Sequence, residues 1–437
     1  MPWIQESGRD FSRQDVLALT ERAAEAARRN VCESPQRVLL LPPDITRAHS
    51  GAGFITEHLF HYFSKRGAEV HVIPTLGQHI PHTPEQNRWM FGSIPEDRIH
   101  AHDYKEGSRV IGEVPAHFVK RVTDGVVDWA MPVSINSMLL DGGWDLIMNV
   151  GHVVPHEVLG FANHNKNYII GLGGKATLCA SHMMAACCGI ENNLGSLVTP
   201  LRACFNYAED TFLSHLPDCY CMVVMRYNES SKLVHSGFFA GDDLDTYLAA
   251  ARLSRQQNVT IVDEPIEKIV AVMQGDEFYS TWVANKAVYR TRMAMADGGE
   301  LLILAPGLKR FGEQPEIEAI IRKYGYVGTE KVMRLWREND DLRDFANGTA
   351  HLMNGSSEGR FTIRYAPGNL SQGDIESVNF EYADLKEATK RYNPEVLKTG
   401  WNTLPDGERV FFISTPSAGL WTTREKLEKR RFPDIVS

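Results

Sequence analysis

Residues 151–182 hold the densest group of side chains that can do chemistry. The stretch has four histidines and two lysines separated by glycines, namely His152, His156, His164, His182, Lys166 and Lys175. Zinc takes three or four histidine, cysteine or carboxylate ligands, so His152, His156 and His182 could form the zinc site of a hydrolase. Pro155 argues against the helix that would put the first two on one face. His182, inside a predicted helix, is the better single ligand, and a single histidine implies a metal that arrives in a cofactor supplying the other donors.

Lys166 and the glycines after it suggest covalent or phosphate chemistry. Lys166 lies among three asparagines, and this segment is too polar for a core, so the lysine is either a surface residue or a nucleophile for covalent attachment. The glycine run that ends in Gly173 and Gly174 precedes a predicted helix, where backbone N–H groups could receive a phosphate. The run lacks the glycine spacing of Walker and dinucleotide-binding loops.

An acidic, a hydroxyl and a basic side chain follow the strand predicted over 37–41, namely Asp44, Thr46 and Arg47. An arginine fork can bind a carboxylate through two hydrogen bonds, which suits an anionic, hydroxylated ligand. The alternative is a salt bridge within a loop.

A histidine follows the next predicted strand, 69–74. His79 comes after Gly77 and Gln78, and His82 is a rival for any role that a histidine has here. In open α/β sheets ligands bind beyond the carboxyl ends of the strands, so we expect His79 and Arg47 at the same edge.

Lys286 is the candidate farther along the chain. It lies in a segment, 278–295, whose pattern predicts one long helix. At a helical position facing a cleft this lysine could pair with a substrate carboxylate, whereas an isolated lysine is by default a solvated surface residue.

The elements that carry these residues predict an α/β protein with two domains. Apolar runs alternate with amphipathic segments, which indicates βαβ units around parallel sheets. The 437 residues exceed one ordinary core, and the pattern restarts near 258–265. We therefore predict two Rossmann-like domains, 1–260 and 261–419, with an active-site cleft between them, and a terminal helical segment, 420–437, that could pack on the first domain. The predicted strands cover 37–41, 69–74, 125–135, 144–150, 219–225, 268–273, 300–305, 361–365 and 409–414.

Composition narrows the function classes. The net charge of −9, with no basic stripe, argues against nucleic acid as a partner. Seven cysteines without a Cys-x-x-Cys pair are typical of reduced thiols in a cytoplasmic protein. We expect no signal peptide and no membrane segment, because the first residues lack a basic start before an apolar core and no apolar run reaches spanning length.

Taken together, these motifs resemble the nickel-pincer lactate racemase family. The resemblance rests on Asp44-x-Thr-Arg47, on Gly-Gln-His79, and on the run from Gly151 through His156 to Lys166 and His182. Lys166 comes ten residues and His182 twenty-six residues after His156, as in the family. The spacing within residues 151–182 is the specific part of the match.

The resemblance implies a cofactor and a role for each matching residue. The cofactor is nickel held by a pyridinium-3-thioamide-5-thiocarboxylic acid mononucleotide, the nickel-pincer nucleotide, joined covalently to Lys166. His182 would complete the nickel coordination, with Asp44, Gly173 and Gly174 also on the cofactor side. His79 and His156 would be the acid/base pair, and Arg47 and Lys286 would bind the substrate. The reaction would be inversion of a 2-hydroxy acid at C2, by reversible hydride transfer, in an isomerase that depends on cofactor-synthesis enzymes.

Departures from the family lie on the substrate side. Residues 162–165 read Ala-Asn-His-Asn where the family has small glycine- and serine-rich residues, and Val283 stands where it has glutamine. The family's tryptophan has Phe345 as its closest counterpart. The added polar groups suggest a substrate more polar than lactate, such as an aldonate. The alternatives are the zinc hydrolase and a small-molecule-binding homologue without catalysis, and the protein could be a homo-oligomer.

Overall fold

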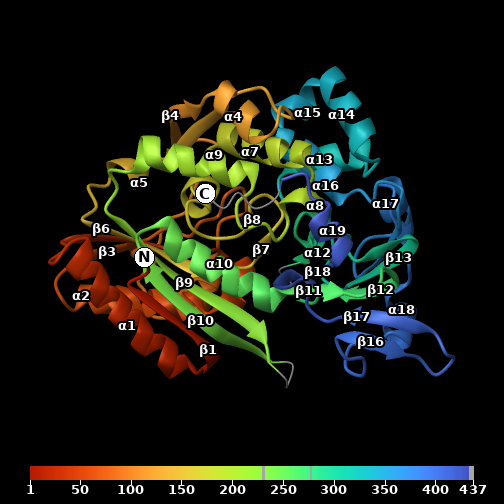
Figure 1. Cartoon of the computed structure of the whole chain (residues 1–437), viewed down its shortest axis with the longest axis horizontal. Coiled ribbons are helices and arrows are strands. Elements are labelled where there is room, and N and C mark those ends of the chain that lie inside the picture. Colours follow the sequence, from red (N-terminus) through yellow and green to blue (C-terminus); the bar gives the residue numbers. More distant parts are fainter. Residues whose placement is uncertain (229–231, 276–277, 433–437) are drawn as a thin grey trace. The chain divides into compact units, whose positions relative to one another are not determined.

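The computed structural model of the chain describes residues 1–228, 232–275 and 278–432, which form two compact units (Figure 1). Unit 1 consists of Met1–Ala180 and Ser196–Asn258; unit 2 consists of Ser181–Gly195 and the described chain from Val259 onward. Among the described residues, every helix is too short or too polar to span a bilayer. The predicted α/β class is confirmed.

Unit 1 is built on a six-stranded mixed sheet. β3, β2, β6 and β9 run parallel, as their apolar runs predicted, and β10 and β1 add an antiparallel edge that the sequence analysis missed. Both missed strands carry polar residues and a glycine that interrupt the apolar pattern. In sheet order the strands are β1 (Ile4–Phe11), β10 (Leu233–Gly241), β9 (Asp218–Tyr227), β6 (Leu146–His152), β2 (Arg37–Leu41) and β3 (Glu69–Val72).

Helices pack on this sheet and close its core. α1 (Arg13–Asn30) begins at a capping box between Ser12 and Asp15, and its buried alanines let it approach β9 and β10 closely. α2 (Ala52–Ser64) packs on β2, β3 and β6 beside α1 (Figure 1). Their apolar faces join Val38, Leu40, Val70 and neighbouring residues in one buried cluster. The carboxyl ends of β2, β3 and β6 are therefore rigidly held.

The strand predicted over 125–135 does not join this sheet. Its last part forms β5 (Met131–Asn136), which pairs antiparallel with β4 (Ser108–Val114) in a separate two-stranded sheet. Residues 126–130 are outside any strand because the chain turns at Asp124 and Gly125, both with positive φ. An apolar run by itself does not specify which strand it pairs with.

Unit 2 contains a second six-stranded sheet with the predicted parallel core. All neighbouring pairs are parallel except β16 and β17. In sheet order its strands are β15 (Glu381–Tyr382), β14 (Thr362–Pro367), β13 (Met295–Ala305), β12 (Ile266–Val272), β17 (Arg409–Ile413) and β16 (Gly400–Thr403).

The prediction of a single helix over 278–295 is wrong. The described part of this segment has two short helices, α11 (Thr281–Ala284) and α12 (Lys286–Thr291), that meet at Asn285. The side chain of Asn285 accepts a hydrogen bond from the Tyr365 hydroxyl at 2.7 Å, which ties the junction to β14. Met295, the last residue of the predicted helix, instead begins β13.

The C-terminal segment forms a strand and a short helix within unit 2. β18 (Leu420–Thr423) pairs with β11 (Val259–Val262), and α19 (Arg424–Glu428) follows β18. Residues 181–195 belong to the same unit. Glu191 explains the grouping, because its carboxylate accepts from Lys426 at 3.0 Å and from Arg360 at 2.9 Å.

Candidate active site

Asp44 and His79 form a hydrogen-bonded pair beyond the carboxyl ends of β2 and β3. A bridge between Pro43 and Thr75 continues the parallel pairing past both strands, which aligns the two loops. His79 Nδ1 donates to Asp44 Oδ2, and Asp44 Oδ1 accepts from the Thr46 hydroxyl at 2.6 Å. Burial alone would raise the pKa of Asp44, but the charge and hydrogen bond of His79 hold it well below its usual range. Asp44 is thus an anion that orients the imidazole.

His82, the rival of His79, has a structural role. Its Nε2 accepts the backbone N–H of Ile45 at 2.9 Å, and its Nδ1 lies 3.1 Å from the side-chain oxygen of Asn87. Burial lowers the pKa of His82, so the ring stays neutral and keeps Nε2 as an acceptor. His82 therefore anchors the short helix η1 (Ile45–Ser50) that carries Arg47.

Lys166 is half-buried, and its side-chain amine forms no hydrogen bond or ion pair with the residues that the structure describes. It opens α6 (Lys166–Ile169). Burial lowers the pKa of its amine to about 7, and the positive charge of Arg47 acts in the same direction. The charges of Asp44 and Glu157 oppose this effect, so all four groups lie within electrostatic reach of one another in unit 1. An unpaired amine that is about half neutral at pH 7 is a nucleophile.

His156 lies on a small hairpin. β7 (Pro155–His156) pairs with β8 (Gly160–Phe161), and the N–H of Val158 donates to His156 Nδ1 at 3.2 Å. In the neutral ring the proton is then on Nε2, which lies 3.9 Å from Glu157 Oε1. His79 has the opposite tautomer, with its proton on Nδ1. One histidine can therefore accept a proton at Nε2 while the other donates one.

The polar residues on either side of Lys166 make their contacts within the chain. His164 stacks on Tyr220, with 4.3 Å between ring centroids, and burial lowers its pKa to about 3, so it is a neutral core residue. Asn165 donates to Glu209 Oε2 at 2.9 Å, and Asn167 donates to Asn149 at 2.6 Å. These contacts remove the observation on which the more polar substrate was predicted.

Arg202 supports the same loop and was missed in the sequence. It lies on α9 (Pro200–Ala208), is fully buried, and donates to the Phe161 carbonyl at 2.8 Å and to the Asn165 side chain. Nothing in the local sequence distinguishes it from a surface arginine on a helix. Only the fold brings it to residues about forty positions earlier.

Gly173 and Gly174 are required by packing. A Cβ at Gly173 would lie 2.0 Å from the Ile169 carbonyl oxygen, and one at Gly174 would lie 2.1 Å from the Ser108 hydroxyl. Their N–H groups donate to the carbonyls of Ile170 and Ser134, at 3.2 and 3.0 Å. Both amides are thus already used, which speaks against the predicted phosphate contact.

His182 and Lys286 belong to unit 2. His182 is half-buried on α7 (Lys175–Cys188), a helix that runs from unit 1 into residues 181–195, and its Nδ1 lies 3.5 Å from the Ser181 hydroxyl. Lys286 is half-buried at the first position of α12. Phe345 is the residue before α16 (Ala346–Gly355).

A zinc site of several protein ligands has no support in this arrangement. Among the described residues, no three His, Cys, Asp or Glu side chains are grouped so that they could hold a metal ion. His152 instead packs edge-on against His49, with 5.3 Å between the ring centroids. A metal held here would need donors from elsewhere, which fits a cofactor that brings its own.

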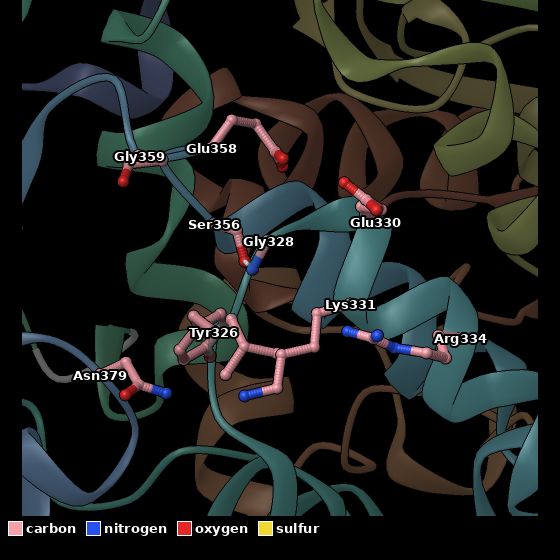
Figure 2. A pocket seen from close by; sticks show the side chains of 11 residues that line it. Tyr326, Gly328, Glu330, Lys331, Arg334, Ser356, Glu358, Gly359 and Asn379 are labelled. Atoms are coloured by element: carbon pink, nitrogen blue, oxygen red, sulfur yellow. Dashed lines mark hydrogen bonds between the residues drawn. The ribbon is translucent and has the colours of Figure 1, made fainter.

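A pocket of about 650 Å³ in unit 2 contains none of the predicted site residues (Figure 2). Lys331 and Arg334 line it from α14 (Thr329–Glu338). The Glu358 carboxylate, also at the pocket, accepts the N–H of Thr329 at 3.0 Å and so caps this helix.

Comparisons with known proteins match the part of the chain that carries most of these residues. Residues 15–193 match the family model described as lactate racemase N-terminal domain, a range that contains Asp44, Arg47, His79, His156, Lys166 and His182. Comparison with the curated proteins gave no match.

Two solved structures have the same fold. A crystal structure of a protein from Thermotoga maritima, a structural genomics target, is 22% identical, with a TM-score of 0.81 over 96% of this chain and 100% of that one. The lactate racemase apoprotein from Thermoanaerobacterium thermosaccharolyticum is 17% identical, with a TM-score of 0.67 over 96% of this chain and 94% of that one. Residues 15–193 therefore match the model of the lactate racemase N-terminal domain, and the chain as a whole has the fold of these two solved structures.

Proposed function

We propose that this protein is an isomerase that racemises or epimerises a 2-hydroxy acid at C2 with a nickel-pincer nucleotide. The observation that carries the proposal is the amine of Lys166. It is half-buried, has no partner among the described residues, and burial lowers its pKa to about 7 beside Arg47 and the Asp44–His79 pair. A buried, unpaired lysine is costly, so its presence at the predicted attachment position favours a covalent role.

The residues present fit the cofactor. About half of the Lys166 amine is neutral near pH 7, and the neutral form is the one that can form an amide-type bond. His182 is the proposed nickel ligand, which needs only one protein donor because the nucleotide provides sulfur and carbon donors. When bound, the group would supply an electrophilic carbon that accepts a hydride from the substrate and returns it to either face.

The two histidines would handle the hydroxyl proton. The Asp44 carboxylate holds the proton of His79 on Nδ1, so Nε2 can accept the substrate's hydroxyl proton. The Val158 N–H holds Nδ1 of His156 as an acceptor, so Nε2 can donate. Inversion needs one acid/base group for each configuration of C2. With opposite tautomers, one histidine can accept the hydroxyl proton and the other can donate a proton, so one direction of the reaction needs no earlier proton transfer.

Arg47 would hold the substrate by its carboxylate. Its guanidinium lies on η1, which Asp44 caps and His82 anchors, so the fork is fixed relative to His79. A fixed carboxylate lets C2 become planar and regain its hydrogen without release of the intermediate keto acid. Lys286 of unit 2 is the second proposed substrate contact.

The substrate class proposed is 2-hydroxy acids. An aldonate was suggested by residues 162–165, but Asn165 and His164 are bound within the chain. Lactate and larger 2-hydroxy acids are therefore to be compared directly, with chiral chromatography of both enantiomers or epimers.

The test begins with protein from a host that makes the nickel-pincer nucleotide. Intact mass should show an adduct and metal analysis should show nickel, and both should be lost in Lys166→Ala but kept in Lys175→Ala, a second half-buried lysine of the same stretch. His79→Ala and His156→Ala should keep the adduct and lose turnover. Wild-type protein without an adduct, or either histidine variant with near-normal rates in both directions, would refute the proposal. Adduct without turnover of any 2-hydroxy acid would favour the non-catalytic homologue.

A further inference from the structure

The loop that leads into Lys166, residues 161–165, has a strained backbone. Asn163 and His164 have φ values of 75° and 60°, both in the left-handed region. Residues other than glycine adopt this conformation at an energetic cost, because the Cβ approaches the following carbonyl oxygen. Two such residues in succession persist only where the surrounding structure determines them.

Arg202 makes the contacts that determine this loop. Its guanidinium donates to the carbonyl oxygens of Phe161 at 2.8 Å and Asn163 at 3.3 Å, and to the side chain of Asn165. It also donates to the Tyr247 hydroxyl at 2.9 Å and lies 4.4 Å from the centroid of that ring. The planar fork therefore binds the loop at three of its five residues while its own charge is stabilised by an aromatic face.

A second set of contacts holds the other side of the loop. The Asn149 side chain donates to the His164 carbonyl at 3.2 Å, and the His164 ring stacks on Tyr220. Tyr220 in turn donates to Glu209 at 2.6 Å, and Glu209 also accepts from Asn165. These contacts hold residues 161–165 in one conformation. Because Lys166 is the next residue in the chain, they also fix the position of its backbone.

We propose that Arg202 is a positioning residue: its fork fixes the loop 161–165 and thereby the point from which Lys166 presents its amine. The identity of the group that Lys166 binds rests on the proposed function, but the positioning is a property of the chain alone. A loop of glycines would adopt this backbone without an anchor, whereas Ala-Asn-His-Asn needs one.

The charges around Lys166 make the effect measurable. Four charged side chains act electrostatically on its amine: Arg47, Asp44, Glu157 and Arg202. The two arginines act with burial to lower the pKa of Lys166. Loss of Arg202 removes one positive charge and loosens the loop so that water reaches the amine. Both changes raise the pKa of Lys166.

The experiment measures the reactivity of Lys166 in the apoprotein. Each lysine is acetylated with acetic anhydride over a range of pH, and labelling is followed by peptide mass spectrometry. The midpoint is the pH at which the labelling rate of that lysine reaches half its maximum. In Arg202→Met the Lys166 midpoint should rise by about one pH unit or more, with about fivefold slower labelling near pH 7. Arg202→Lys keeps the charge but loses the fork, so its Lys166 midpoint should lie between those of the wild type and Arg202→Met. Tyr247→Phe removes the hydrogen bonds of one hydroxyl, from Arg202 and to the Phe161 carbonyl, but keeps the Arg202 fork, so it should shift the midpoint least.

Two controls separate positioning from general destabilisation. Lys175 in the same samples should keep its midpoint. Thr123→Val, which removes a buried hydroxyl that donates to Val119 at 2.8 Å elsewhere in unit 1, should lower stability without moving Lys166.

The outcomes distinguish this inference from the proposed function. Overlapping Lys166 profiles in the wild type, R202M and R202K would overturn it, and if R202M does not fold, R202K and Y247F decide. Wild-type protein without an adduct refutes the proposed function and leaves the positioning result standing. A normal adduct with an unchanged Lys166 profile in the Arg202 variants refutes the positioning role alone.

Discussion

Nδ1 of His79 donates its hydrogen to Oδ2 of the buried Asp44. The pair joins two loops that follow adjacent parallel strands, and it fixes both the orientation and the tautomer of the imidazole. A histidine held in this way keeps its other nitrogen as the atom that exchanges protons.

Asp44→Asn should slow turnover without loss of cofactor. The amide cannot hold the positive charge that His79 gains and can present an N–H to Nδ1, which favours the wrong tautomer. We expect kcat to fall by about 10²–10⁴, the usual worth of general acid/base catalysis. Rates in both directions, with intact mass on the same sample, check it. A rate within about threefold of wild type would show that the pair is only structural.

Arg47→Lys should weaken substrate binding more than it slows the chemical step. A lysine keeps the charge but loses the second hydrogen bond to a carboxylate, so KM should rise by about tenfold or more. A substrate analogue with a carboxamide in place of the carboxylate should be handled equally poorly by both proteins. An unchanged KM for the acid would place the carboxylate elsewhere.

His82→Phe should leave the shape of the pH–rate profile unchanged. The ring stacks near Phe91, which phenylalanine can imitate, but the hydrogen bond to the Ile45 N–H is lost. We expect an increased KM, because η1 and Arg47 lose their anchor, and a stability loss of about 1–3 kcal/mol. Loss of one limb of the profile would instead identify His82 as an acid/base residue.

Lys166→Met should stabilise the apoprotein most at low pH. The pKa of Lys166 is about 7 in the folded chain against 10.5 for a free lysine. Between these values the unfolded chain binds a proton that the folded chain does not, so wild-type stability falls as pH decreases from about 10.5 to about 7.

The variant lacks this penalty. Its free energy of unfolding should exceed that of wild type by more than about 1 kcal/mol near pH 7, and the difference should shrink near pH 9.5. Urea unfolding at both pH values measures it. If the variant and the wild type differ in free energy of unfolding by the same amount at both pH values, the pKa of the Lys166 amine is not lowered in the folded chain.

The sequence by itself determined the parallel core and where the site must begin. The runs at β2, β6 and β9 are largely apolar on both faces, which is typical of a covered parallel sheet. Because the carboxyl ends of such strands share an edge, Asp44 and His79 had to lie near each other. The order and spacing of residues 151–182 pointed to Lys166.

Only the tertiary structure decided which partner each polar residue has. His79 and His82 are equivalent in the local sequence, and the fold gave one to Asp44 and the other to the backbone of Ile45. It also brought Arg202 and Glu209 to the loop before Lys166 and gave Asn165 and Asn167 hydrogen-bond partners within the chain. Long-range hydrogen bonds depend on which surfaces meet after burial, and that information is absent from the periodicity of any single segment.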